Sequence, residues 1–124
     1  MQPAILKQNL GTEFYTDELC YITELSNSAG DPAVSIARAR VEPGVTTRWH
    51  RLDETAERYV MLSGEGLVEV ADLPPTKVLP GDVVLIPPFA RQRITNTGKE
   101  QLIFLAICSP RFQPEVYEDI EDAQ

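Results

Sequence analysis

The side chains best suited to chemistry lie in one short stretch, RWHRLDETAERYVMLSGEG at 48–66. It contains His50, the only histidine among the 124 residues. Two positions later, where a second ligand-type side chain could share a strand face with His50, the chain has Leu52, and Glu57 follows in the same stretch. Imidazole and carboxylate groups bind divalent ions and also transfer protons. The stretch therefore indicates a metal site, the remnant of one, or a polar residue in a core.

Short apolar or alternating segments, separated by Gly, Pro and Asn turns, surround this stretch. The segments typical of strands are 32–41, 45–52, 58–62, 67–71, 77–79, 83–87, 91–95 and 101–108. No helical periodicity spans the middle of the chain, so the pattern predicts an all-β antiparallel barrel or sandwich. The first 25 residues fit a short helix or a strand, and the tail from about Gln113 is expected to carry one helical turn.

Length and composition favour one soluble domain without a nucleic-acid or membrane partner. The net charge is −8, whereas nucleic-acid binders usually present a basic surface. We expect a cytoplasmic protein, because the chain shows no signal-peptide pattern and no long apolar span. The acidic run at 115–122 is expected to be a solvated tail or terminal turn. Cys20 and Cys108 lie in apolar runs and are expected to be free buried thiols.

The spacing of several residues resembles the two-part signature of the cupin family, G-x5-H-x-H-x(3,4)-E-x6-G followed by G-x5-P-x-G-x2-H-x3-N. Seven of the ten signature positions match, namely Gly44, His50, Glu57, Gly64, Gly81, Pro87 and Asn96. The resemblance implies a small bacterial cupin of the conserved-barrel type, a single-domain antiparallel β-barrel or double-stranded jelly roll. We expect one cupin domain over 1–124, with the core barrel at about 32–110, an N-terminal arm at 1–31 and an acidic C-terminal tail at 111–124.

The chain departs from the signature where the resemblance places metal ligands. Leu52 stands at the second histidine, Gln92 at the third, and Phe89 at a glycine of the second motif. Leucine cannot bind a metal ion, and a glutamine carbonyl is a neutral, weak ligand. His50, Glu57 and Gln92 are the remaining candidate ligands, for a weakly bound Mn, Fe, Ni or Zn ion. The resemblance therefore implies a degenerate metal site.

Two interpretations of these three polar residues stay open. In the first, His50, Glu57 and Gln92 hydrogen-bond one another in the barrel, with water or with a bound small molecule, because a buried carboxylate needs partners. In the second, the three side chains hold a weakly bound ion whose remaining ligands are waters. Glu54 is a further candidate ligand if its loop folds inward.

Strand parity extends the predicted ligand-binding interior. Tyr59 and Met61 have the parity of Glu57 and should line the same space. Arg48 has the parity of His50; an inward Arg48 would favour an anionic group, whereas at the start of the strand it would face solvent. The predicted interior consists of His50, Glu57, Gln92, Tyr59, Met61, Arg48 and Leu52.

The same parity predicts which large side chains face outward. Arg91 and Arg93 alternate with Gln92 and so should face away from the interior. Trp49 alternates with His50, and an outward tryptophan on a barrel strand predicts a covered surface, such as a second subunit. Arginine outnumbers lysine eight to three, which predicts surface and interface salt bridges or, alternatively, an anionic ligand held by one or two arginines.

We expect a small-molecule-binding barrel with a degenerate metal site. The alternative is a metal-dependent enzyme, an isomerase, decarboxylase, lyase or dioxygenase acting on a small polar metabolite, in which His50, Glu57 and Gln92 hold the ion. Acid–base catalysis by His50 and Glu57 without metal is a third interpretation, and a structural or partner-binding domain is a fourth. The sequence leaves open whether the protein is an enzyme. The expected partners are a small molecule in the barrel and a second copy in a homodimer, since small cupins are commonly dimers.

Overall fold

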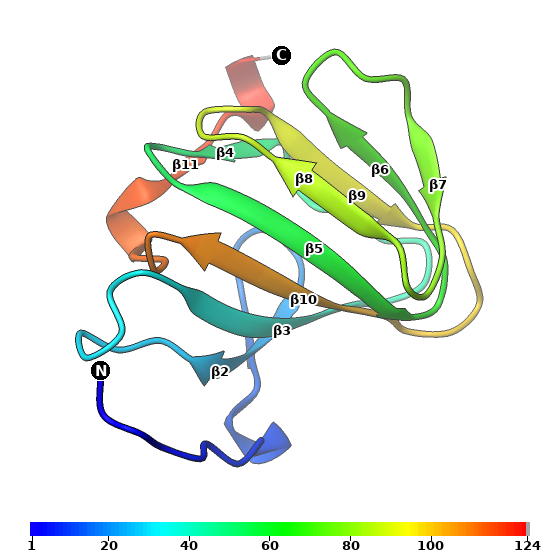
Figure 1. Ribbon diagram of the computed structural model, residues 1–124. Helices are drawn as coiled ribbons and strands as arrows, with labels where there is room; N and C mark the ends of the chain where they lie inside the picture. The colour runs from blue at the N-terminus through cyan, green and yellow to red at the C-terminus, as the bar shows by residue number, and fades with distance from the viewer. Residues whose placement is uncertain (124) are drawn as a thin grey trace.

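The computed structural model describes residues 1–123, and their regular secondary structure consists almost entirely of antiparallel strands (Figure 1). One sheet has the strand order β1-β2-β3-β10-β5-β8, and the other has the order β11-β4-β9-β6-β7. The two sheets face each other and enclose the core, as an all-β cupin or jelly-roll fold requires. This confirms the predicted fold class.

The six-stranded sheet contains β1 (Phe14–Tyr15), β2 (Tyr21–Ser26), β3 (Ser35–Val41), β5 (Ala56–Ser63), β8 (Val83–Ile86) and β10 (Leu102–Ser109). The five-stranded sheet contains β4 (His50–Leu52), β6 (Gly66–Val70), β7 (Thr76–Val78), β9 (Gln92–Asn96) and β11 (Tyr117–Asp119). Three short 3-10 turns complete the described chain, η1 (Leu10–Thr12), η2 (Pro114–Val116) and η3 (Glu121–Ala123).

Strict alternation along the strands places polar side chains inside the barrel. In β9 the buried residues are Gln92, Ile94 and Asn96, while the residues between them are half-buried. In β5 the buried residues are Glu57, Tyr59 and Met61. Because successive side chains point to opposite faces, Gln92 and Glu57 enter the interior together with the apolar residues of their strands.

Of the helix and the strand expected in the first 25 residues, the structure shows strands, β1 and β2. Leu19 has a φ of 76°, and its N–H donates to the carbonyl oxygen of Thr16 at 3.1 Å. This tight turn joins β1 to β2, and β2 then pairs with β3, with Ile22 opposite Ala39. The six-stranded sheet thus takes two strands from the region before residue 32.

The acidic run near the C-terminus is part of the barrel wall, so the expectation of a solvated tail is wrong for β11. This strand pairs with β4 and places Tyr117 opposite Leu52. Glu118 pairs with Arg51 at 2.9 Å, and the expected helical turn before β11 is present as η2. Gln124 of the predicted tail lies outside the described residues.

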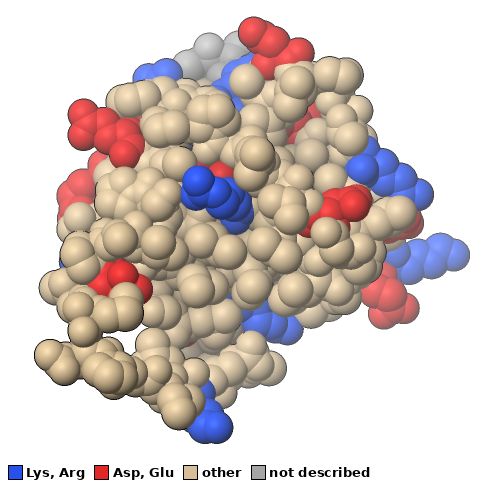
Figure 2. Space-filling model, viewed as in Figure 1, with Lys and Arg blue, Asp and Glu red and all other residues tan. Residues whose placement is uncertain are grey.

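The outer surface of the six-stranded sheet carries few charges. Figure 2, in the view of Figure 1, shows mainly uncharged side chains on this face, with one prominent Lys or Arg near its centre and most other charged side chains toward the rim. Val83 and Leu85 of β8 are 56% and 66% exposed on this face. Cys20 and Cys108 are buried and free, as predicted. Within residues 1–123, no helix is long and apolar enough to cross a membrane.

Candidate functional site

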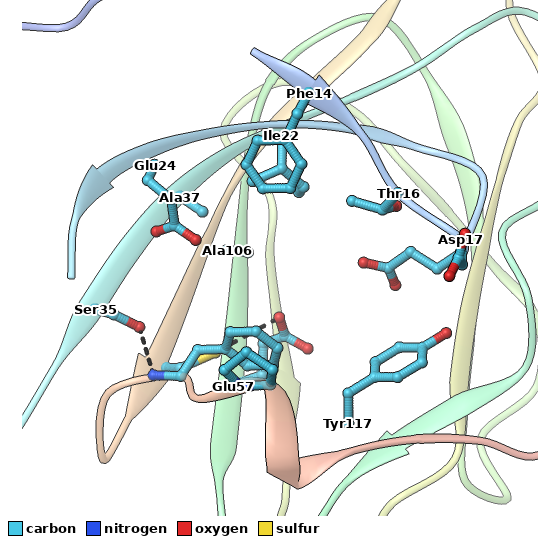
Figure 3. A pocket seen from close by; sticks show the side chains of 14 residues that line it. Phe14, Thr16, Asp17, Ile22, Glu24, Ser35, Ala37, Glu57, Ala106 and Tyr117 are labelled. Atoms are coloured by element: carbon cyan, nitrogen blue, oxygen red, sulfur yellow. Dashed lines mark hydrogen bonds between the residues drawn. The ribbon is translucent and has the colours of Figure 1, made fainter. Parts of the chain in front are cut away.

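A two-part cavity lies between the inner face of the six-stranded sheet and the segment around β11 (Figure 3). The wider part, here called the outer chamber, has a volume of about 270 Å³. A narrower part of about 50 Å³, the inner chamber, reaches His50, Leu52 and Tyr59. The residues that border both chambers are Glu18, Ile22, Glu57, Ala106, Phe112 and Tyr117. The two chambers therefore lie side by side and share six lining residues.

Glu57 forms the polar base of the outer chamber. It lies on β5 opposite Cys108 of β10, and its side chain is 9% exposed. The amide Nε2 of Gln92 donates to one carboxylate oxygen of Glu57 at 2.8 Å. The Cys108 thiol lies 3.7 Å from the other oxygen and donates to it. Glu57 is therefore buried with a partner on each oxygen, which is the arrangement that a buried carboxyl group requires.

Gln92 joins Glu57 to Tyr59. The Tyr59 hydroxyl donates to the Gln92 carbonyl oxygen at 2.5 Å, and Gln92 is completely buried. The Tyr59 ring also packs on Phe104, with ring centroids 4.4 Å apart. Because the tyrosine can donate to the amide oxygen and the carboxylate accepts from the amide nitrogen, both ends of the Gln92 amide are used within the network.

Burial raises the pKa of Glu57 to about 7, from an ordinary value of 4.5. The nearby His50 and the hydrogen bond from Gln92 act in the opposite direction, and the negative charge of Glu18 adds to the rise in the pKa. A carboxyl group with a pKa near neutrality can both hold and release a proton under ordinary conditions. Such a group beside a cavity is a candidate proton carrier.

His50 lies on β4, directly opposite Gln92 of β9, and is 3% exposed. Its Nδ1 atom lies 2.7 Å from the carbonyl oxygen of Arg48 and must donate to it, because a carbonyl only accepts. Its Nε2 atom lies 3.3 Å from a carboxylate oxygen of Glu18, close enough for an ion pair with that carboxylate. The imidazole also stacks on Tyr117, with ring centroids 5.2 Å apart.

The structure brings together most of the residues that the sequence predicted for the interior. His50, Glu57 and Tyr59 border the inner chamber, and Gln92 connects Glu57 to Tyr59 behind them. Leu52 is buried and borders the same chamber. Met61 is also buried, but it packs in the apolar core and lines neither chamber.

Arg48 lies outside the cavity, so its placement in the predicted interior is wrong, and the alternative of a solvent-facing side chain at the start of the strand is confirmed. Its Nε donates to Asp119 at 2.6 Å on the protein surface. Residues 47–49 precede the first residue of β4 and are not in regular strand geometry, so strand parity does not apply to them. Glu54 is exposed, with a φ of 54°, and does not supply the ligand considered for it.

Trp49 faces away from the interior, as predicted, but its own chain covers it. The guanidinium groups of Arg91 and Arg93 lie 4.5 and 4.3 Å from the ring centroid, and the indole residue is only 8% exposed. Arg91 and Arg93 are thus on the outside, as expected. Trp49 gives no support for a second subunit, because it does not form an exposed apolar surface.

Much of the lining was not anticipated from the sequence, and three unpredicted residues contact the predicted ones directly: Glu18, Tyr117 and Cys108. Glu18 and Tyr117 come from segments outside the region that resembles the cupin signature, so spacing gave no signal for them. Cys108 did carry a signal, because it shares strand parity with the interior residues Phe104 and Ala106. That parity could have placed its thiol beside Glu57.

A family model described as the cupin domain matches residues 37–108, more than half of the chain, and the protein belongs to the cupin family. The uncharacterized protein MJ1618 of Methanocaldococcus jannaschii is 33% identical over 87 residues, which cover 70% of this chain and 69% of that protein.

Two solved structures show the same fold. The nucleoside dehydratase Pac13 of Streptomyces is 15% identical, with a TM-score of 0.77 over 95% of this chain and 92% of that chain. A predicted oxalate decarboxylase from Thermotoga maritima is 22% identical, with a TM-score of 0.77 over 86% of this chain and 99% of that chain. At these identities the similarity concerns the fold alone.

The residues at the metal-ligand positions of the cupin signature do not fit a metal ion. Leu52 offers no lone pair. The Gln92 amide turns its N–H, not its oxygen, toward Glu57, so a cation between them would have to break the hydrogen bonds of Gln92 to Glu57 and Tyr59. Among the described residues, no cluster of three or more His, Cys, Asp or Glu side chains could hold an ion.

Proposed function

We propose that this cupin binds a small molecule in the two-chamber cavity and that it does so without a resident metal ion. One observation carries the proposal: the cavity ends on buried polar groups, namely the hydrogen-bonded set Glu57, Gln92 and Tyr59 and, beside it, His50, which instead contacts Arg48 and Glu18. A concave site with apolar walls and a few convergent polar groups is the usual form of a small-molecule site.

The position of Glu57 supports the same function. It borders both chambers, so a ligand in the outer chamber would contact a carboxyl group whose charge changes near neutral pH. Metal-dependent chemistry, the alternative drawn from the resemblance, has no support from the donor set at Leu52 and Gln92.

Ligand-observed NMR with a mixed set of small polar metabolites would test the proposal. The test variant is Ala106→Leu, because Ala106 borders both chambers and a larger side chain would fill them. The control is Ile107→Leu, on the outer face of the same strand. We expect metabolites to bind the wild type and the control but not Ala106→Leu, with all three proteins folded by circular dichroism. Equal binding by all three would place the ligand elsewhere and refute the proposal.

Proton transfer on the bound molecule is a second candidate function. Two groups that can carry a proton border the cavity: Glu57, with its raised pKa, and the imidazole of His50, which lies 3.3 Å from the Glu18 carboxylate. The nucleoside dehydratase with a similar fold shows that a barrel of this shape can host an elimination reaction. Conversion of a bound metabolite by the wild type, and its loss in Glu57→Gln with binding retained, would assign an isomerase or lyase. Retained conversion in Glu57→Gln would exclude Glu57 as the proton carrier.

A further inference from the structure

The charge of the cavity lining is of one sign. The carboxylates that line the outer chamber are Asp17, Glu18, Glu24 and Glu57. Among the described residues, no lysine or arginine lines either chamber. The one basic side chain among these lining residues is His50, in the inner chamber. Figure 3 shows Glu24 and Asp17 on opposite sides of the outer chamber, with Glu57 at its base. These carboxylates would repel an anionic molecule in the outer chamber.

Six of the eleven Lys and Arg side chains form ion pairs with carboxylates elsewhere. Arg40 pairs with Glu13 at 2.6 Å, and Arg48 pairs with Asp119 at the same distance. Other ion pairs join Arg38 to Glu13, Arg51 to Glu118, Lys77 to Glu65 and Arg93 to Glu69. All of these carboxylates lie outside the cavity. The lining carboxylates therefore stand out as a group that Lys and Arg do not neutralise.

Glu24 is the clearest case in this group. Glu24 is exposed and borders the outer chamber, and partial burial of its carboxyl group raises the pKa of that group. A partly desolvated carboxylate gains most from a positive group that enters the same space. An organic cation in the outer chamber would supply that group.

Aromatic rings and an unpaired hydroxyl complete the lining. Phe14, Phe112 and Tyr117 border the outer chamber, and their rings can contact a cation or the apolar part of a ligand. The Tyr117 hydroxyl oxygen is buried and has no hydrogen-bond partner within residues 1–123. This oxygen can accept a hydrogen bond from an N–H group, which a protonated amine provides and a quaternary ammonium does not.

We propose that the ligand of this cavity is a small protonated amine with an apolar body. The lining carboxylates face the ammonium group, and the Tyr117 hydroxyl accepts a hydrogen bond from one of its N–H groups. The apolar body of the ligand lies among the aromatic rings of the lining and Ile22. The chamber, at about 270 Å³, limits the ligand to a small molecule. The inference rests on the proposed binding function and names its ligand class; it replaces the anionic ligand that an inward Arg48 would have favoured.

Isothermal titration calorimetry with n-butylammonium, butyrate and 1-butanol tests the charge preference at constant chain length. We expect butylammonium to bind at least about tenfold more tightly than the other two, and Glu24→Gln to weaken it about tenfold, since a hydrogen bond to a charged group contributes that much. Glu100→Gln removes the same charge from an exposed position outside the cavity and should leave binding unchanged.

Three results would overturn the inference: butyrate or butanol binding as tightly as butylammonium, equal weakening by Glu24→Gln and Glu100→Gln, or no binding of butylammonium at all. None of them depends on the comparison of Ala106→Leu with Ile107→Leu, which tests the binding function. A barrel that loses its metabolites in Ala106→Leu but prefers butyrate or butanol would keep its proposed function and lose this ligand class.

Discussion

Replacing Glu57 with glutamine should remove a pH-dependent loss of stability. Between the ordinary pKa of 4.5 and the folded-state pKa of about 7, the unfolded chain releases the Glu57 proton while the folded chain keeps it. The folded state then binds more protons, so stability falls as pH rises through this range and is level above it. Glutamine has no proton to release. It can still accept from Gln92 and face Cys108, so the variant should keep the network.

The size of the effect follows from the two pKa values. The interval between 4.5 and about 7 corresponds to about 3 kcal/mol at ~1.4 kcal/mol for each pH unit. Other carboxylates also make stability depend on pH: the pKa values of Glu13, Glu118 and Asp119 are lowered by hydrogen bonds from arginine. Those contributions are the same in both proteins, so the difference between wild type and variant isolates Glu57.

Urea unfolding of wild type and Glu57→Gln at a series of pH values from about 5 to about 8 measures this difference. We expect Glu57→Gln to gain about 2.5 kcal/mol of the full difference relative to the wild type across this pH range, while Glu100→Gln, an exposed control, runs parallel to the wild type. Parallel curves for Glu57→Gln and wild type would show that Glu57 does not hold its proton to neutral pH, and would contradict its assignment as a proton carrier.

Tyr59→Phe should lower the free energy of unfolding by about 1–3 kcal/mol, because it leaves the buried Gln92 amide oxygen unpaired. The control is Tyr15→Phe, at a residue that is 56% exposed, and it should change the free energy of unfolding by less than about 0.5 kcal/mol. Arg48→Gln should leave ligand affinity in calorimetry unchanged, since Arg48 lines neither chamber, and a loss of affinity would show that it does contribute. We expect the wild type to be a homodimer by light scattering, because the exposed side chains of β8 are apolar, and Leu85→Glu to be monomeric; a monomeric wild type would refute this interface.

Most of the barrel could be predicted because alternating β-branched and apolar residues define strands with few competing interpretations. β5, β6, β9 and β10 lie within one or two residues of the predicted segments. The segment 45–52 was predicted as one strand, but regular pairing begins only at His50. Before His50, the Thr47 hydroxyl replaces a backbone acceptor, and the Ile94 N–H donates to it at 3.0 Å.

The sequence predicted the residues of the site that lie at signature positions and missed those that lie outside the signature. His50, Glu57 and Gln92 lie at fixed signature positions, so their convergence followed from the resemblance. Glu18 and Tyr117 enter through β-turn and edge-strand contacts that depend on how the two chain ends fold back on the barrel. Local sequence pattern does not determine such long-range contacts, so the acidic and aromatic lining of the outer chamber became visible only in three dimensions.

Metal analysis of two proteins tests most directly the claim that this cupin binds its ligand without an ion. Wild type and the double variant Leu52→His with Gln92→His, both purified without a histidine tag, would be analysed for metal content and titrated with Mn, Fe, Ni and Zn. The double variant restores imidazoles beside His50 on β4 and opposite it on β9, and should bind one ion per chain. The wild type is predicted to hold far less than one ion per chain, and a tightly bound stoichiometric ion in the wild type would contradict the account.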